Sequence, residues 1–288
     1  MARLLHPQNL LVVAQVALFA LVSSWLWSFV SPIVSPYLPQ ALQLATHDGT
    51  SSGSPYECRT HHYSTQIVSL DPLLIYIEDF LRPAEITELL EASENGFAPS
   101  TVYKNGKKSG TPDRTSLSAA LPRDNPTVDC VLSRAQDFMG SMIDPSRDDI
   151  GPPQLVRYTA GQRFNKHHDW YDNPQPARQG MRGRGSSWNR MASFFAILED
   201  GCEDGETWFP YVDNARARFG DDDSEDEARR WRAHEDGGLA FKPVAGNALF
   251  WVNLHANGTG DDRTVHAGLP VTGGLKTAMN IWPRKFYD

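Results

Sequence analysis

Residues 154–169 read QLVRYTAGQRFNKHHD, and this stretch indicates both the kind of fold and the kind of site. It begins with the apolar run Leu155–Tyr158, which is typical of a β-strand, and it ends in two histidines and an aspartate. Side chains alternate between the two faces of a strand. We therefore expect His167 and Asp169 to point to one side and His168 to point to the other.

The segments that follow Gln154 are short, apolar and closely spaced, a texture typical of a β-sandwich or jelly roll. Helical patterns come earlier, since Pro83 opens one that closes at Asn95-Gly96 and a second follows Pro126. Helices first and strands afterwards predict an α+β fold in which the helices support one face of a β core. The strand-like runs are Leu73–Ile77, Leu155–Tyr158, Ser193–Leu198, Leu239–Phe241, Ala248–Trp251 and Thr277–Ile281.

The composition excludes several classes of protein. A chain of 288 residues with 40% hydrophobic and 22% charged residues can bury a sizeable core. The net charge of -8 argues against nucleic acid as a partner, because a protein that wraps it needs a basic face. Three cysteines are too few for a disulfide scaffold or a cysteine-based zinc module. Cys130 has the pattern of a buried thiol on a helix, and a disulfide between Cys58 and Cys202 stays open.

The N-terminal part of the chain contains an apolar segment. Residues 10–30 carry no charge, and 21 residues in a helix span about 31 Å, the thickness of a bilayer's hydrocarbon core. Arg3 precedes the segment and the next basic residue is Arg59, so the positive-inside rule puts residues 1–9 in the cytosol. We expect a single-pass type II signal anchor in the endoplasmic reticulum or another secretory-pathway membrane, with a cleaved signal peptide as the alternative.

The remainder of the chain divides into a stem and a lumenal domain. Residues 31–65 are rich in Pro, Ser and Gly and have little apolar periodicity, which indicates a linker. The folded domain is expected over residues 66–288. Within it, Asn173–Asn189 and the acidic Gly220–Glu227 have the composition of long loops, either solvated insertions or a lid over a site. Asn257 begins an Asn-Gly-Thr glycosylation motif.

A third metal ligand is best supplied by His266, which precedes another strand-like run. Two imidazoles and one carboxylate on one face form the facial triad of non-haem iron oxygenases, which leaves coordination positions open. Lys276 follows on the next strand-like segment, and its charge suits the far carboxylate of a chelating dicarboxylate. A metal-dependent hydrolase on a similar core is the alternative, but it would need a general base and no such cation.

Five different motifs follow one another along the chain from Arg114 to the C-terminal region. They are Arg114-Thr115-Ser116; Arg157-Tyr158 continuing to His167-x-Asp169; Arg190-x-x-Ser193 with Gly205-Glu206-Thr207-x-Phe209-Pro210; Pro243 to Asn253; and His266 to Trp282, with Lys276 and Asn280. As an ordered set they resemble the catalytic domain of the prolyl 4-hydroxylase family of iron(II)/2-oxoglutarate-dependent dioxygenases. The resemblance runs from about Leu73 to the C-terminus. Asp204 departs from it, because the family commonly has glycine there.

The resemblance implies a double-stranded β-helix (jelly-roll) core, with iron(II), 2-oxoglutarate and L-ascorbate as cofactors. It assigns iron binding to His167, Asp169 and His266, and 2-oxoglutarate binding to Lys276, Tyr158 and Ser193. Candidates for the substrate pocket are Arg157, Trp282 and Asn280. A surface role for Arg157, a core role for Tyr158 and a purely structural role for Arg114 stay open.

The activity implied by the resemblance is hydroxylation of a C–H bond, first of all 4-hydroxylation of peptidyl proline in secretory-pathway proteins. Proline-rich segments adopt polyproline II, which docks in aromatic grooves. Two alternatives remain: an oxygenase that acts on a free amino acid or small metabolite, and a catalytically inactive lumenal binding module.

Overall fold

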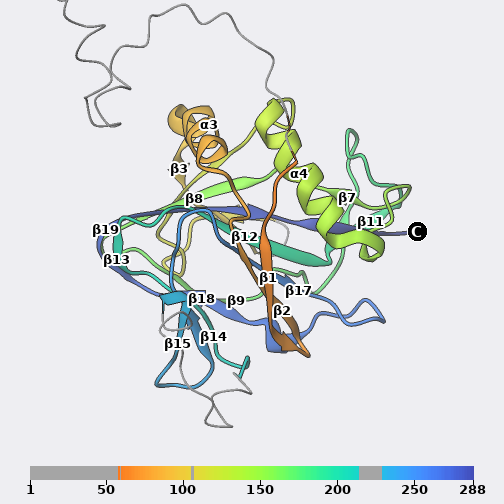
Figure 1. Ribbon diagram of the computed structural model, residues 1–288. Helices are drawn as coiled ribbons and strands as arrows, with labels where there is room; N and C mark the ends of the chain where they lie inside the picture. Colours follow the sequence, from red (N-terminus) through yellow and green to blue (C-terminus); the bar gives the residue numbers. More distant parts are fainter. Residues whose placement is uncertain (1–57, 59, 105–106, 214–228) are drawn as a thin grey trace, which may run out of the picture. The chain divides into compact units, whose positions relative to one another are not determined.

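The computed structural model describes residues 58, 60–104, 107–213 and 229–288 (Figure 1). The expected cytosolic tail, the membrane segment 10–30 and the stem up to residue 57 lie outside these residues, and so does Gly220–Glu227. Within the described part of the chain, no helix is both long enough and apolar enough to cross a bilayer.

Short antiparallel strands make up most of the described domain. Their bounds are β1 Ser64–Leu70, β2 Leu73–Glu78, β3 Ala98–Pro99, β4 Val102–Lys104, β5 Lys107–Ser109, β6 Leu117–Ala120, β7 Asp149–Ile150, β8 Gln154–Thr159, β9 Phe164–His167, β10 Gln175–Pro176, β11 Ser187–Arg190, β12 Ala192–Glu199, β13 Cys202–Asp204, β14 Thr207–Phe209, β15 Trp231–Ala233, β16 Leu239–Phe241, β17 Ala248–Val252, β18 His266–Gly268, β19 Val271–Ile281 and β20 Pro283–Tyr287.

Two of the sheets face each other and enclose the site. Among the described strands, the larger sheet has the order β1-β2-β17-β12-β19-β8-β6-β3, with β13 pairing to β19. The smaller sheet has the order β15-β16-β14-β18-β9. Leu74 and Trp251 of the larger sheet pack with Phe209 and Phe241 of the smaller one, so a shared apolar core holds the two sheets together. A four-stranded sheet, β10-β11-β20-β7, and the β4-β5 hairpin complete the described strands.

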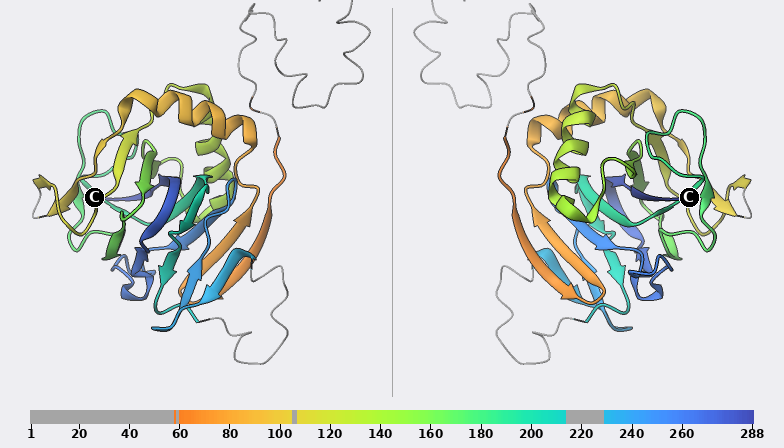
Figure 2. Two further views of the ribbon diagram at one scale, coloured as in Figure 1. Left: turned by 90° about the vertical axis from the view of Figure 1, so that its left-hand side faces the viewer. Right: turned by 90° about the vertical axis from the view of Figure 1, so that its right-hand side faces the viewer.

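Two α-helices cover the other face of the larger sheet, as expected (Figures 1 and 2). Helix α3 (Pro83–Ser93) and helix α4 (Pro126–Met139) begin at the two prolines that the sequence indicated. Asn125 caps α4, because its Oδ1 accepts hydrogen bonds from the backbone N–H groups of Thr127 and Val128. The apolar faces of both helices pack on alternate residues of β12, namely Ala192, Phe194, Ala196 and Leu198. The intervening β12 side chains are thereby left to face the smaller sheet.

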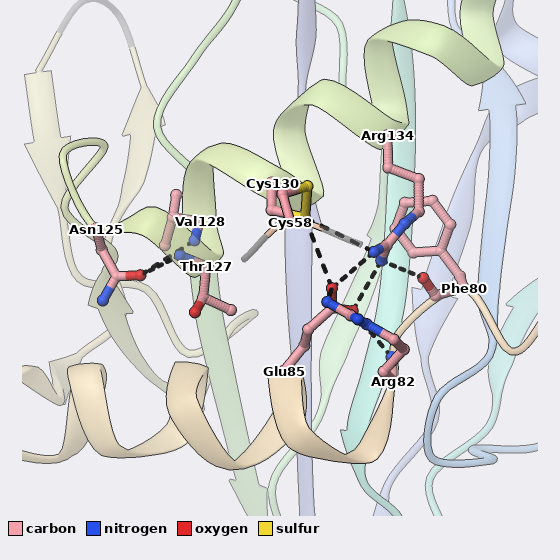
Figure 3. The surroundings of a disulfide bond; sticks show 9 residues. All are labelled: Cys58, Phe80, Arg82, Glu85, Asn125, Thr127, Val128, Cys130 and Arg134. Atoms are coloured by element: carbon pink, nitrogen blue, oxygen red, sulfur yellow. Dashed lines mark hydrogen bonds and ion pairs between the residues drawn. A yellow bond between two sulfur atoms is a disulfide. The ribbon is translucent and has the colours of Figure 1, made fainter. Parts of the chain in front are cut away.

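The disulfide corrects our expectation for the cysteines. Cys58 is bonded to Cys130, and Cys202 is the free thiol (Figure 3). Cys130 is therefore not a free buried thiol, and the Cys58–Cys202 pairing left open by the sequence is not formed. The bonded cysteines are 72 residues apart, and only the packing of α4 beside the segment that enters the domain brings them together.

A buried ion cluster lies next to this disulfide (Figure 3). Glu85, on α3, is fully buried and accepts two hydrogen bonds from Arg134 of α4, at 2.6 and 2.8 Å. Arg82 donates a further hydrogen bond to it, at 2.7 Å. Burial raises the pKa of Glu85, but the hydrogen bonds from Arg134 and Arg82 outweigh it and bring the pKa down to about 2. The carboxylate is therefore ionised and paired.

We expect Glu85→Gln to lower the free energy of unfolding by about 3–5 kcal/mol, because it leaves the buried Arg134 guanidinium without its counter-charge. The matched control is Glu88→Gln on the exposed side of the same helix, which should change little. Since folding depresses the Glu85 pKa, its contribution should be complete above the unfolded pKa and lost as the pH falls toward about 2. Chemical denaturation at several pH values measures both effects, and equal losses in the two variants would contradict the prediction.

Candidate functional site

The three expected metal ligands lie together at the ends of two neighbouring strands of the smaller sheet. His167 ends β9 and pairs directly with His266, which begins β18. Asp169 follows β9 after one residue. The candidate ligand atoms of the three residues all lie within 4.8 Å of one another, and no other group of this kind occurs in the described ranges.

The backbone around these ligands differs from our expectation in one respect. The stretch 154–169 is two strands on different sheets, β8 and β9, separated by a turn at Ala160-Gly161. Asp169 is therefore beyond the strand end. His168 nevertheless points away from the cluster, since its Nε2 donates to the backbone carbonyl of Asp262 at 3.2 Å. The choice of His167 over His168 thus agrees with the geometry.

Hydrogen bonds orient both imidazoles toward a common point. His167 Nδ1 donates to the carbonyl of Asn165 at 2.8 Å, and His266 Nδ1 donates to that of Thr264 at 3.0 Å. A carbonyl oxygen can only accept, so the proton of each neutral ring is on Nδ1. The Nε2 lone pairs are therefore free for a metal, and the rings are held by the backbone.

The third ligand is held by a network from the larger sheet. Asp169 Oδ2 accepts hydrogen bonds from Ser193 Oγ at 2.7 Å and from Trp282 Nε1 at 3.0 Å. Ser193 Oγ in turn accepts from Asn253 Nδ2 at 2.9 Å. The other carboxylate oxygen, Oδ1, lies 3.9 Å from His167 Nε2. One oxygen is thus occupied by protein donors, while the other faces the imidazoles.

The protonation states suit a divalent metal. Burial lowers the pKa of His266, and burial together with the neighbouring His266 lowers that of His167, so both rings are neutral. Burial raises the pKa of Asp169, but His266 and Arg190 outweigh it and hold the pKa well below its usual range. Two neutral imidazoles and one carboxylate are the donor set that non-haem iron(II) takes, without deprotonation of any ligand.

A cavity of about 630 Å³ opens in front of the three ligands and is lined by both sheets. Tyr158 and Lys276 are directly paired across β8 and β19, so both side chains project into it. Lys276 is 2% exposed, and its Nζ donates to the Gly205 carbonyl at 2.5 Å. Burial lowers the pKa of Lys276 to about 8, against the opposing effects of Cys202 and Glu206. Asn280 lies four residues beyond Lys276 on the same face of β19 and also lines the cavity.

For Arg157 the geometry favours the surface role that the sequence left open over a place in the substrate pocket. It neighbours Tyr158 on β8 and must therefore face the other side of the sheet. Its Nε donates to Thr277 Oγ1 at 3.1 Å, its Nη2 lies 3.4 Å from Glu199, and its guanidinium stacks on Phe97. Arg157 does not line the cavity. The alternation rule that separated His167 from His168 would have assigned it correctly.

Ser193 and Trp282 lie at the site, but they contact Asp169. Ser193 is fully buried, does not line the cavity and donates to the carboxylate, whereas we expected it on the co-substrate side. Trp282 lines the cavity with its ring and donates to the same carboxylate.

Arg114 and Arg190 were not among our site candidates, but both line the cavity. Each arginine belongs to one of the motifs that carry the family resemblance, and that membership could have identified both as site residues.

Comparison with known proteins identifies relatives of the chain. The sequence profile of the 2OG-Fe(II) oxygenase superfamily matches residues 153–284. The chain is 27% identical over 232 residues to Prolyl 4-hydroxylase 1 of Arabidopsis thaliana, covering 79% of this chain and 74% of that protein. It is 29% identical over 226 residues to Prolyl 4-hydroxylase subunit alpha-3 of Mus musculus, covering 77% of this chain but only 35% of that subunit.

A solved structure shows the same fold. The viral collagen prolyl hydroxylase vCPH from Paramecium Bursaria Chlorella virus-1, in its 2OG complex, aligns with a TM-score of 0.51 at 22% identity. The alignment covers 74% of this chain and 96% of the viral one. The mostly antiparallel sheets with two supporting helices therefore match a known jelly-roll oxygenase fold.

Proposed function

Since the chain belongs to the 2OG-Fe(II) oxygenase superfamily and is related to the prolyl 4-hydroxylases, we propose that it hydroxylates peptidyl proline at C4. The observation that carries the proposal is the cluster of His167, Asp169 and His266, which shares one cavity with the buried cation of Lys276. An inactive binding module would have no need of three correctly protonated ligands. A hydrolase would have no need of that cation.

The side chains divide the work as follows. His167, Asp169 and His266 would hold iron(II) through Nε2, Oδ1 and Nε2. When bound, the metal supplies the redox chemistry that couples oxidation of 2-oxoglutarate to hydroxylation of the substrate. Lys276 would bind the far carboxylate of 2-oxoglutarate, and the Tyr158 hydroxyl would contact the same molecule. Ser193 and Trp282 hold the Asp169 carboxylate in position. L-Ascorbate would keep the iron reduced.

The cellular setting belongs to the same proposal. We infer that residues 10–30 anchor the chain in an endoplasmic reticulum or other secretory-pathway membrane, with residues 66–288 as the lumenal catalytic domain. The Cys58–Cys130 disulfide supports an oxidising compartment, because such bonds persist there and are rare in the cytosol. Asn257 is exposed, which suits a glycosylated position. Treatment with a glycosidase, followed by a change in mobility on a gel, tests the lumenal assignment.

The activity is tested with the full-length chain, iron(II), ascorbate and 2-oxoglutarate. Succinate is measured with and without proline-rich peptides, and the peptides are examined for the mass of one added oxygen atom. Peptide-stimulated succinate together with 4-hydroxyproline is the expected result. Succinate that no peptide stimulates would reject peptidyl proline as the substrate and favour a small molecule. No succinate from a folded, iron-loaded sample would overturn the proposal.

The binding of 2-oxoglutarate should weaken as the pH rises above about 8. In the free protein Lys276 loses its charge above a pKa of about 8, and only the ammonium form attracts a dicarboxylate. The dissociation constant should then rise by up to about tenfold per pH unit. Calorimetry with Mn²⁺ as a non-turnover metal measures this, and Lys276→Arg is the control because arginine stays charged. A pH-independent dissociation constant in the unsubstituted protein would contradict the prediction.

A further inference from the structure

The cavity has more positive charge than the metal and the co-substrate require. The described charged side chains that line it are four cations and two carboxylates: Arg114, Lys166, Arg190 and Lys276, against Asp113 and Asp169. The charge of a divalent metal and that of a dicarboxylate cancel, so the positive excess persists when both are bound. The chain as a whole carries a net charge of -8, which makes this local excess opposite in sign to the rest of the molecule.

Arg114 is the clearest uncompensated cation of the cavity. Its hydrogen bonds go to neutral acceptors only: Ser116 Oγ at 3.3 Å, the Thr101 carbonyl at 3.5 Å and Gln154 Oε1 at 3.2 Å. No described carboxylate forms an ion pair with it. Its guanidinium also stacks on the Phe164 ring, 4.9 Å from the centroid. The side chain is thus fixed in place, yet only three of its five N–H groups are used.

Arg190 is a second cation that lines the same cavity as Arg114. It donates to the Asp169 carbonyl at 3.1 Å and stacks on the Trp282 ring, 3.6 Å from the centroid. Burial lowers the pKa of Arg114, and the like charge of Arg190 acts in the same direction, so the two cations influence each other. Asp169, the acidic group that they share, is a candidate metal ligand. Neither arginine therefore has a carboxylate of its own.

We propose that the site selects a substrate that carries a carboxylate close to the hydroxylated carbon, and that Arg114 is the residue that binds it. The inference rests on the proposed oxygenase function and adds the substrate's charge. A guanidinium fork pairs with a carboxylate through two parallel hydrogen bonds, and Arg114 has the unused N–H groups for such a pair. The carboxylate can come from an acidic residue beside proline in a peptide or from the α-carboxylate of a free amino acid.

Two matched pairs of probes test the proposal on the full-length chain loaded with metal and 2-oxoglutarate. One pair is a proline-rich peptide with Glu beside the proline and the same peptide with Gln. The other pair is L-proline and L-prolinamide. The carboxylate member of at least one pair should have a kcat/KM about tenfold higher or more, as a charged hydrogen bond implies. Which pair discriminates identifies the source of the carboxylate.

Substitutions show whether Arg114 is responsible. In Arg114→Gln the ratio within the discriminating pair should fall to near one, and Arg114→Lys should restore part of it. Arg163→Gln is the control for net charge, because Arg163 is exposed and does not line the cavity. It should leave the ratio unchanged. Because the two probes of one pair are compared on the same variant, a general loss of activity caused by disturbance of the Phe164 ring cancels in the ratio of their kcat/KM values.

The outcomes separate this inference from the proposed function. Affinities of all four probes for the protein loaded with Mn²⁺ and 2-oxoglutarate are measured by calorimetry, so that the test does not depend on turnover. Hydroxylation of the Glu and Gln peptides at equal kcat/KM, with equal affinities in both pairs, would overturn the carboxylate inference and support the oxygenase. Preferred binding of a carboxylate probe with no hydroxylation of any peptide would support the inference and reject peptidyl proline.

Discussion

Replacement of His167 by alanine should abolish metal binding and hydroxylation, whereas replacement of His168 should leave both close to normal. The two histidines are adjacent and both line the cavity, but their Nε2 atoms face different partners. His167 Nε2 faces Asp169 and His266, while His168 Nε2 donates to the carbonyl of Asp262. Loss of an outer partner of a ligand already costs 10–100-fold in metal affinity, so loss of a ligand should cost more than about 100-fold. For His168→Ala we expect a change within about twofold.

The measurement is the affinity for Mn²⁺ or Co²⁺, followed by succinate formation with iron(II). His266→Ala should behave like His167→Ala, because the two imidazoles form one site. Circular dichroism and the unfolding midpoint show whether each variant is folded. Full activity in a folded His167→Ala or His266→Ala variant, or loss of activity in His168→Ala alone, would show that the ligand assignment is wrong.

Replacement of Lys276 by methionine should remove most of the affinity for 2-oxoglutarate without loss of stability. Lys276 is nearly fully buried, and in the described part of the chain its hydrogen-bond acceptor is the carbonyl of Gly205 alone. An ammonium has three donors, so the free protein holds a poorly satisfied cation in an apolar environment between the rings of Tyr158 and Phe195. That cost is offset only when a carboxylate binds.

A charged hydrogen bond contributes about 1.5–3 kcal/mol, so the dissociation constant for 2-oxoglutarate should rise by about 10–150-fold. Methionine fills a similar volume without the charge, so the free energy of unfolding in the absence of co-substrate should stay the same or increase. Lys285→Met on β20 is the exposed control and should change neither quantity. If Lys276→Met binds 2-oxoglutarate normally, or if it fails to fold, the buried lysine is a structural residue.

Local patterns were sufficient for the two α-helices and for six of the strands in the described domain. Pro83 and Pro126 start the two helices, and Leu239–Phe241 and the run from Ala248 are strands as expected, because turn residues and apolar runs act within a few positions. The C-terminal strand was too short in the prediction, since β19 begins at Val271. Thr272, Gly273 and Gly274 have the composition of a turn, but pairing with β13 holds them in the sheet.

The sequence by itself indicated the resemblance to the prolyl 4-hydroxylase family, the candidate metal ligands and a lysine suited to a dicarboxylate, because these depend on residue types at fixed spacings. Tertiary structure alone decided which surfaces meet. The bond between Cys58 and Cys130 and the contact of Ser193 with Asp169 join elements far apart in the chain, and no local pattern specifies such contacts. Arg114 became part of the cavity for the same reason: its neighbours there come from other strands, and only the packed sheets place its charge beside the candidate metal ligands.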